Sequence, residues 1–362
     1  MVTKTVTALI SRKSSPGGWL VLLLLLCSSV SFGQLKVRAL QRTVEKESSR
    51  MHTIGRTKQL APLGLPFFDD FSRPLVVDSS GLMFPDLNRW QSSYSVWINP
   101  GMAIHPPTIN VATFDGLDSA GLAYNPNDVF ISGFTDSLTS SKIDLSTSAA
   151  VNPVAESERY SVYISFFYQW RGNGEAPDEQ DYLELLFKND LEEWEFAWRS
   201  PVQTFQRDLF YSAIVQVAGN TFFHNAFQFQ IRSFGRQSGP FDTWNLDYVY
   251  LNKGRSATDT SFPDRAAASP ISPLFKPFSA MPYTHFLISG TLDSVRFDVQ
   301  NLKNENSAAN YKADIEYSIF KDGSPAQFTK VVEDAKSVTP RFGLDPLGRV
   351  TVKIDTLPQV IS

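Results

Sequence analysis

The sequence predicts an all-β protein in which a two-sheet sandwich precedes a smaller β module. Short runs of alternating apolar and polar residues recur along the chain, turn clusters separate them, and no segment of similar length carries a helical stripe. Composition agrees, because 13% of the residues are aromatic and only 19% are charged, fewer than solvated helix faces usually need.

Residues 1–33 have the layout of a cleavable secretory signal peptide. A basic region precedes the apolar run Trp19–Leu26, and the small residues Ser31 and Gly33 stand just before Gln34. The run is much shorter than the ~20 apolar residues of a membrane span. We therefore expect cleavage after Gly33, no transmembrane segment in the mature chain, and a secreted or cell-surface protein exported across the inner membrane.

Cysteine usage and charge exclude several functions. Cys27 is the single cysteine and leaves with the signal peptide, so the mature chain forms no disulfide and no thiolate metal site. Residues 1–33 hold three basic and no acidic residues, so their removal takes the formal net charge from −4 to −7. A nucleic-acid partner is not expected, because such a partner requires a basic face.

Residues 34–64 form a basic arm with little apolar periodicity. The arm is interpreted as a flexible leader between the signal peptide and the first domain. A basic contact with anionic lipid or polysaccharide is the alternative.

Residues 65–255 contain about ten short predicted strands, which favour two stacked antiparallel sheets. Tyr160–Gln169 shows the pattern most clearly, with apolar residues at every second position. The other runs are Trp90–Ile98, Ile109–Phe114, Leu138–Leu145, Tyr182–Phe187, Glu192–Trp198, Leu209–Val217, Ala226–Ser233 and Trp244–Leu251.

A proline-rich stretch of small residues marks 256–275 as a linker, and 276–362 as a second β module. The module's predicted strands are Ser294–Val299, Tyr311–Phe320, Phe328–Val332 and Arg349–Ile354. An immunoglobulin-type sandwich has about seven strands. We therefore expect a partial immunoglobulin-like module, either a small one or the start of one in a longer protein, and favour the second.

Several short sequence segments, which follow one another within residues 65–255, resemble those of a known family. They are Pro66–Phe71, Pro106-Pro107 leading to Val111–Gly116, Tyr163–Trp170 with the loop Gly172–Gly174 and Leu183–Phe187, and Asp242–Leu251. Together they are similar to the jelly-roll domain, related to concanavalin-like and MAM-like sandwiches, of large exported proteins of Gram-negative bacteria with type IX secretion. The resemblance implies a jelly-roll β-sandwich and a surface location, and it names no activity. The sorting domain typical of that family is not visible in the sequence.

Catalytic patterns are weak, and we expect no enzyme activity. The carboxylate pairs Glu193/Glu195 and Asp314/Glu316 lack the alternating acidic triplet that glucanases of concanavalin type would present on one strand. The four histidines are widely separated, and no thiol nucleophile survives signal cleavage.

Calcium is the metal that the sequence favours. The resemblance to jelly-roll sandwiches implies a structural Ca²⁺ that joins the first and last strands through oxygen ligands. Asp69 and Asp70 lie at the first predicted strand and Asp247 in the last, so these three residues are the candidate ligands. The alternative is that Asp70 caps a turn and Asp247 pairs with an arginine.

A second acidic cluster follows a glycine-rich turn. It is interpreted as a solvated hairpin end, with a second cation site as the alternative, and consists of Glu175, Asp178, Glu179 and Asp181.

The tryptophans allow two interpretations. Exposed rings on one sheet would stack on sugars, whereas rings between two sheets are core. We favour core, because Trp194 and Trp244 occupy positions that alternate inward; no sugar-binding residue is assigned.

These observations favour a non-catalytic, exported protein with a role in adhesion or surface structure. The alternative is a carbohydrate-binding module attached to a longer secreted protein. The partners expected are a surface polysaccharide or envelope proteins.

Overall fold

The computed structural model describes residues 61–76, 82–91, 94–201, 205–260, 262, 264–273, 282, 284–285, 294–303, 315–319, 328–332, 338–339 and 348–354. The predicted signal peptide and nearly all of the basic arm lie outside the described residues. Among the described residues, no helix has the length and apolar character needed to cross a membrane.

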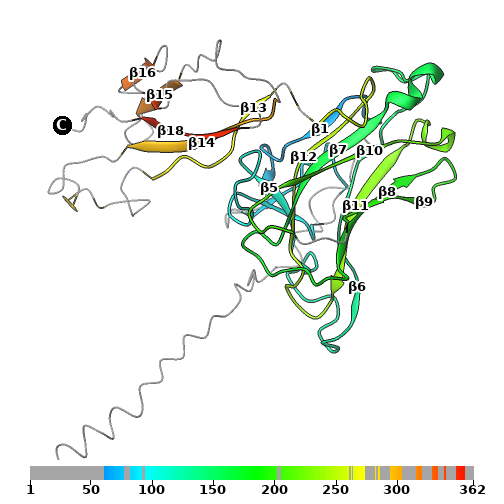
Figure 1. Ribbon diagram of the computed structural model, residues 1–362, viewed down its shortest axis with the longest axis horizontal. Helices are drawn as coiled ribbons and strands as arrows, with labels where there is room; N and C mark the ends of the chain where they lie inside the picture. The colour runs from blue at the N-terminus through cyan, green and yellow to red at the C-terminus, as the bar shows by residue number, and fades with distance from the viewer. Residues whose placement is uncertain are drawn as a thin grey trace, which may run out of the picture. The chain divides into compact units, whose positions relative to one another are not determined.

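The predicted all-β fold is confirmed, and its main part is a sandwich of two antiparallel sheets (Figure 1). The first sheet has the order β10-β7-β12-β5-β4-β3-β2, and β1 also pairs with β12. Its strands are β1 (Phe67–Asp69), β2 (Leu75–Val76), β3 (Met83–Phe84), β4 (Trp97–Asn99), β5 (Val111–Phe114), β7 (Tyr163–Trp170), β10 (Tyr211–Gln216) and β12 (Trp244–Asn252).

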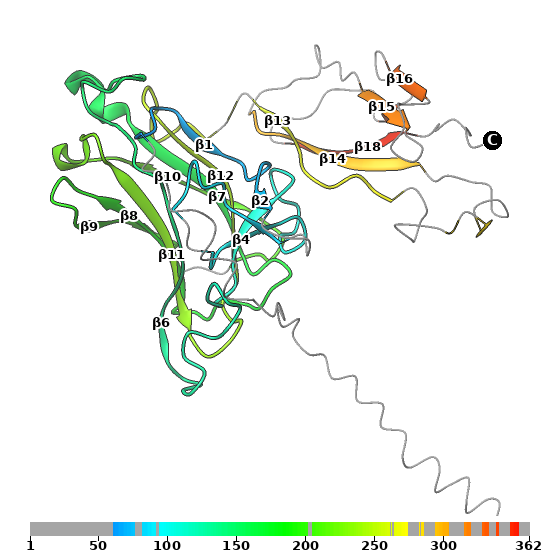
Figure 2. The same cartoon turned by 180° about the vertical axis from the view of Figure 1, so that it is seen from behind.

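The second sheet has the order β6-β11-β8-β9 and forms the other layer, as the reverse view also shows (Figure 2). Its strands are β6 (Ser132–Thr139), β8 (Tyr182–Lys188), β9 (Trp194–Arg199) and β11 (Gln228–Arg236). Two short 3₁₀ helices, η1 (Glu156–Ser161) and η2 (Asn220–Phe222), occur in the connections.

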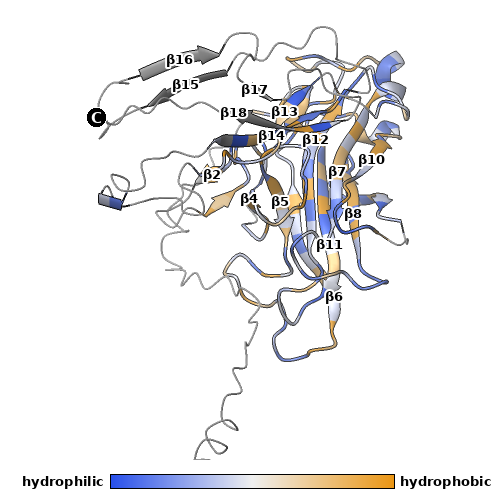
Figure 3. Ribbon diagram, turned by 60° about the vertical axis from the view of Figure 1, so that its left-hand side comes forward, coloured by the Kyte–Doolittle hydropathy of each residue, from blue (hydrophilic) through white to orange (hydrophobic). Residues whose placement is uncertain are grey.

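One hydrophobic core fills the space between the two sheets. In this core the rings of Trp90, Phe67 and Phe229 meet one another edge-on. The ring centroids of the three pairs lie 5.1–5.6 Å apart. Inward-facing side chains of β7 and β8, such as Ile164 and Leu185, are fully buried. Apolar residues colour much of β7 and β10 (Figure 3). The alternation in the sequence therefore reports burial between two layers.

Most predicted strands of the sandwich match observed ones, but the run at Leu138–Leu145 is placed too late. The strand is β6, Ser132–Thr139, and beyond it the chain keeps only single bridges at Ser140 and Ile143. The start of β6 extends past the core and is partly exposed, so it has no continuous apolar pattern. The prediction located the buried residues and missed the exposed half of the strand.

Two other predicted strands of the sandwich begin three or more residues later in the structure. In the run Trp90–Ile98, only Trp97–Asn99 is a strand, and Trp90 makes a single bridge to Ser140. Tyr160 belongs to η1, so β7 begins at Tyr163. The last residues of the predicted arm are also structured, because Leu63 bridges Ile143.

The second β module contains two further antiparallel sheets. One has the order β13-β14-β18-β17, with β13 (Arg265–Ala267), β14 (Val295–Asn301), β17 (Val338–Thr339) and β18 (Arg349–Ile354). The other pairs β15 (Ile315–Ile319) with β16 (Phe328–Val332). Strand β13 lies inside the segment 256–275 predicted as a linker, so pairing in this module begins earlier than the composition suggested.

Candidate ligand-binding pocket

The predicted calcium ligand Asp69 ends β1 and is buried. Its Oδ2 accepts a hydrogen bond from Trp90 Nε1 at 2.6 Å, and its Oδ1 accepts one from the Phe71 backbone N–H at 2.9 Å. Burial raises the pKa of Asp69 to about 6, and these two hydrogen bonds oppose the rise. Both carboxylate oxygens thus have protein donors.

Asp247 is fully buried in β12 and is held by Thr108. The Thr108 N–H donates to Oδ2 at 2.8 Å, and the Thr108 hydroxyl lies 2.9 Å from both Oδ1 and the Asp70 backbone oxygen. Burial raises the pKa of Asp247 well above its usual value, and the nearby charge of Asp70 adds to the rise. Asp70 and Asp247 are therefore neighbours across the domain's first and last strands.

The alternative interpretation holds for Asp70, whose Oδ1 caps a turn by accepting from the Ser72 N–H and hydroxyl. Asp247 has Thr108 as its hydrogen-bond partner rather than an arginine. A calcium ion at Asp69, Asp70 and Asp247 stays a prediction.

Another set of carboxylates comes together in the described part of the chain. Oxygens of Asp178, Asp181 and Asp242 all lie within 4.8 Å of one another. The predicted acidic cluster supplied two of these residues. Asp242 was missed because it stands 61 positions beyond Asp181 and reaches the cluster through the turn before β12.

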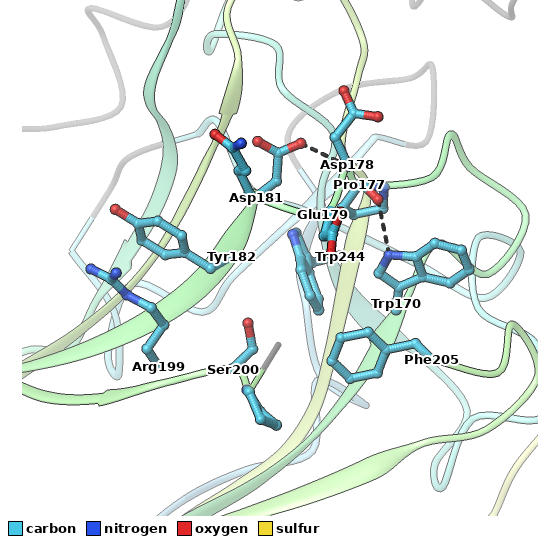
Figure 4. Close-up of a pocket in the computed structure, with 12 residues that line it drawn as sticks. Trp170, Pro177, Asp178, Glu179, Asp181, Tyr182, Arg199, Ser200, Phe205 and Trp244 are labelled. Carbon is cyan, nitrogen blue, oxygen red and sulfur yellow. Dashed lines mark hydrogen bonds between the residues drawn. The ribbon is translucent and has the colours of Figure 1, made fainter. Parts of the chain in front are cut away.

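Next to these carboxylates lies a pocket of about 570 Å³ at one end of the sandwich (Figure 4). It is formed where β7, β8, β9 and β12 end or begin, together with the loop before β8. Its lining consists of Trp170, Pro177, Asp178, Glu179, Gln180, Asp181, Tyr182, Arg199, Ser200, Pro201, Phe205 and Trp244.

Aromatic rings form one wall and the floor. Trp170 and Trp244 are direct cross-strand partners at the ends of β7 and β12, so both side chains leave the same face of the sheet. Phe205 stacks on Trp170 with an interplanar angle of 17° and meets Trp244 edge-on at 5.7 Å. The wall is therefore built from three segments that are distant in the sequence.

The indole nitrogen of Trp244 is a buried donor with no hydrogen-bond partner. In Figure 4 the nitrogen is on the side of the ring that faces the loop carrying Glu179 and Asp181. Trp170 differs, because its Nε1–H donates to the Pro177 backbone oxygen at 3.2 Å. A buried donor without a partner is unfavourable, and this one lies beneath the pocket lining.

Polar side chains form the opposite wall. The Asp178 N–H donates to Asp181 Oδ2 at 2.7 Å, which fixes the loop before β8. Burial raises the pKa of Asp242 to about 7, and the negative charges of Asp181 and Glu175 contribute to this rise. Burial also raises the pKa of Asp181. This wall offers carboxyl oxygens to a ligand's hydroxyl groups.

The turn after β7 positions Trp170 and requires glycine. Gly172 has a φ of +59°, and a Cβ there would lie 2.4 Å from the Met102 backbone oxygen. The Arg207 Nε–H donates to the Gly172 oxygen at 2.7 Å and ties this turn to the segment that follows Phe205. The sequence signal for the site is thus a tryptophan followed by a glycine-rich turn.

The tryptophan predictions are right for Trp244 and wrong for Trp194. Trp244 is fully buried, as expected of core, although one edge also lines the pocket. Trp194 is exposed at the start of edge strand β9, where Lys188 lies over its ring. The first three residues of β9 are all exposed, so alternation in this strand does not report burial between the two sheets.

Comparisons with known proteins give a fold likeness alone. No family model matches the chain, and no curated protein sequence matches it. Among solved structures, the CBM22-1 xylan-binding domain of Paenibacillus barcinonensis Xyn10C is 11% identical, with a TM-score of 0.29, over 55% of this chain and 100% of that one. The CBM22-1–CBM22-2 tandem of the same protein is 10% identical, with a TM-score of 0.30, over 82% of this chain and 86% of that one. Neither likeness bears on function at this level of similarity.

Proposed function

We propose that the sandwich binds carbohydrate, without cleaving it, in the pocket between Trp170 and Asp181. The observation that carries the proposal is a pocket of about 570 Å³ in which the rings of Trp170 and Phe205 lie near the carboxylate of Asp181. Such a lining favours a ligand with hydroxyl groups beside an apolar surface.

Sugars have that combination of groups. The C–H faces of a pyranose pack on aromatic rings, and its hydroxyls both donate and accept hydrogen bonds. Trp170 and Phe205 supply the rings, Asp181 supplies acceptors, and Arg199 supplies donors. The cavity volume lies in the range of small-molecule sites, which run from about 300 to 1,000 Å³.

The positions of the carboxylates favour binding over hydrolysis. Glycosidases flank the scissile bond with two carboxyl groups about 5 to 9.5 Å apart, on either side of the sugar. Asp178 and Asp181 line the pocket, and each has an oxygen within 4.8 Å of the other and of Asp242, so these carboxylates lie together rather than on two sides of a ligand. Glu193 and Glu195, the predicted strand pair, both accept hydrogen bonds from the Asn189 side chain and do not line the pocket.

Export and a surface role belong to the same proposal. The layout of residues 1–33 supports a secreted or cell-surface location, and N-terminal sequencing of the exported protein should then begin at Gln34. Binding of a surface polysaccharide would serve adhesion or surface structure.

The function is tested by a glycan array followed by titration calorimetry on the glycans retained. Trp170→Ala and Phe205→Ala should each weaken binding about five- to tenfold, because each removes an aromatic contact that contributes about 1–1.5 kcal/mol to binding. Tyr160→Ala is the matched control, since Tyr160 is an exposed aromatic residue outside the pocket. Equal affinities for Trp170→Ala and Tyr160→Ala would overturn the proposal.

A further inference from the structure

Tyr182 and Arg199 line the pocket and also belong to the outer face of the second sheet. Leu183 and Leu185 of β8 point into the core, so the alternate residues Tyr182 and Glu184 face outward. In Figure 4 the Arg199 guanidinium lies beside the Tyr182 ring, at the edge of the pocket. The pocket therefore opens onto this face.

From Tyr182, a row of planar groups crosses the second sheet. Tyr182 stacks on Phe234 at 4.9 Å with an angle of 4°, and Phe234 meets Phe134 edge-on at 5.4 Å. The Arg199 guanidinium lies 3.6 Å from the centre of the Tyr182 ring, and that of Arg232 lies 3.5 Å from the centre of the Phe134 ring. We name these five residues the outer-face row.

The row is held rigid from beneath. Glu184, which is only 2% exposed, pairs with Arg199 at 3.0 Å and with Arg232 at 2.6 Å. The carboxylate thereby fixes both guanidinium groups over their rings. Phe134 remains 42% exposed although it is a large apolar side chain. A rigid, solvent-facing aromatic surface loses little conformational entropy on binding a ligand.

We infer that the outer-face row extends the pocket into an elongated site that binds further units of the same glycan chain. This inference rests on the proposed carbohydrate function and specifies its ligand as an oligo- or polysaccharide rather than a single sugar. The row crosses four strands, a width of about 14 Å at the usual strand spacing. The Tyr182 ring has Phe234 on one face and the Arg199 guanidinium on the other, so the row offers a ligand ring edges, guanidinium planes and N–H donors. It adjoins the pocket through Tyr182 and Arg199.

The experiment measures how affinity depends on chain length. Calorimetry with β-1,4-linked gluco-, xylo- and manno-oligosaccharides, from the disaccharide to the hexasaccharide, should show affinity for at least one series that rises with length. Phe134→Ala and Phe234→Ala should lower the affinity for the hexasaccharide of that series about tenfold, and so reduce the ratio of hexasaccharide to disaccharide affinity.

Phe130→Ala is the matched control, because Phe130 is 89% exposed and lies outside the row. A far-ultraviolet spectrum and a melting midpoint verify that each variant is folded. Equal wild-type affinities for the disaccharide and hexasaccharide, or equal effects of Phe134→Ala and Phe130→Ala, would overturn the elongated site and leave the pocket function standing. If the wild-type protein binds none of the three oligosaccharide series, the elongated site is also overturned. If the glycan array retains no glycan, the pocket function itself is overturned.

Discussion

Asp242 sits in a left-handed backbone conformation, with a φ of +59°, in the turn that leads into β12. Aspartate and asparagine tolerate this conformation better than most residues. The Asp242 carboxylate accepts a hydrogen bond from the Arg236 N–H, and its own N–H donates to Glu175 Oε2 at 3.0 Å. The residue thus joins the loop before β8 to the turn before β12, beside the pocket.

The raised pKa of Asp242, about 7, makes stability depend on pH. The folded state binds a proton at Asp242 more tightly than the unfolded state, in which an aspartate has a pKa of about 4. Protonation of Asp242 therefore favours folding, and this contribution is complete below about pH 4. That contribution is lost as pH rises through 7, where Asp242, Asp181 and Glu175 repel one another.

Asp242→Asn should therefore raise the melting midpoint at pH 8 by a few degrees relative to wild type, with no gain at pH 4. Asparagine keeps an acceptor for the Arg236 N–H and carries no charge. Differential scanning calorimetry across this range checks the prediction, with the exposed Asp190→Asn as control. Parallel pH profiles for wild type and Asp242→Asn would contradict it.

At the scale of the element, the second sheet has two faces with opposite chemistry. The inward residues of β8 and β11, such as Leu185 and Ile231, belong to the core, whereas the outward ones form the ladder Arg232–Glu184–Arg199. The cross-strand register places Arg232 opposite Glu184, and Glu184 opposite Arg199. Opposite charges on directly facing residues stabilise this register.

Glu184→Gln should lower the free energy of unfolding by about 2–3 kcal/mol, since two guanidinium groups lose a buried counter-charge. The effect stays below that of a fully enclosed pair because Arg199 is 46% exposed. Urea denaturation measures it. The control Glu156→Gln removes a carboxylate that is 82% exposed and should change stability by less than about 0.5 kcal/mol. Equal effects of the two variants would exclude a stabilising role for the ladder.

At the scale of the whole molecule, the first and last strands of the sandwich close the fold. Asp69 of β1 pairs with Val249 of β12, and Thr108 connects Asp70 with Asp247. The sequence has a single cysteine, Cys27, so the chain cannot form an internal disulfide at this closure. We propose that Ca²⁺ stabilises it, with Asp70 and Asp247 as the candidate ligands. The third predicted ligand, Asp69, is bound instead by Trp90 Nε1 and the Phe71 N–H.

A chelator should then lower the melting midpoint of the protein, and added Ca²⁺ should restore it. At a free Ca²⁺ concentration of a hundred times the dissociation constant, binding adds about 2.7 kcal/mol to the free energy of unfolding. Asp247→Asn should abolish the response to Ca²⁺, whereas the exposed Asp190→Asn should keep it. An unchanged midpoint with and without chelator removes calcium from this site.

The amino-acid sequence by itself determined the all-β class, the two-layer sandwich and the positions of most strands. It could do so because alternation with period two is a local property: one face of each strand must leave water, whichever strand lies opposite. The same logic failed at the ends of the layers. Half of β6 is exposed, and Trp194 lies on an edge strand, so neither follows the rule for a strand buried between sheets.

Only the tertiary structure decided where a ligand fits. Trp170, Phe205 and Trp244 form one wall, and Asp242 joins Asp178 and Asp181, although these residues come from separate segments of the chain. Composition predicted the kinds of side chain but not their meeting, because strand order and sheet stacking bring them together across long sequence distances. The pocket, the unpartnered Trp244 donor and the outer-face row follow from that packing.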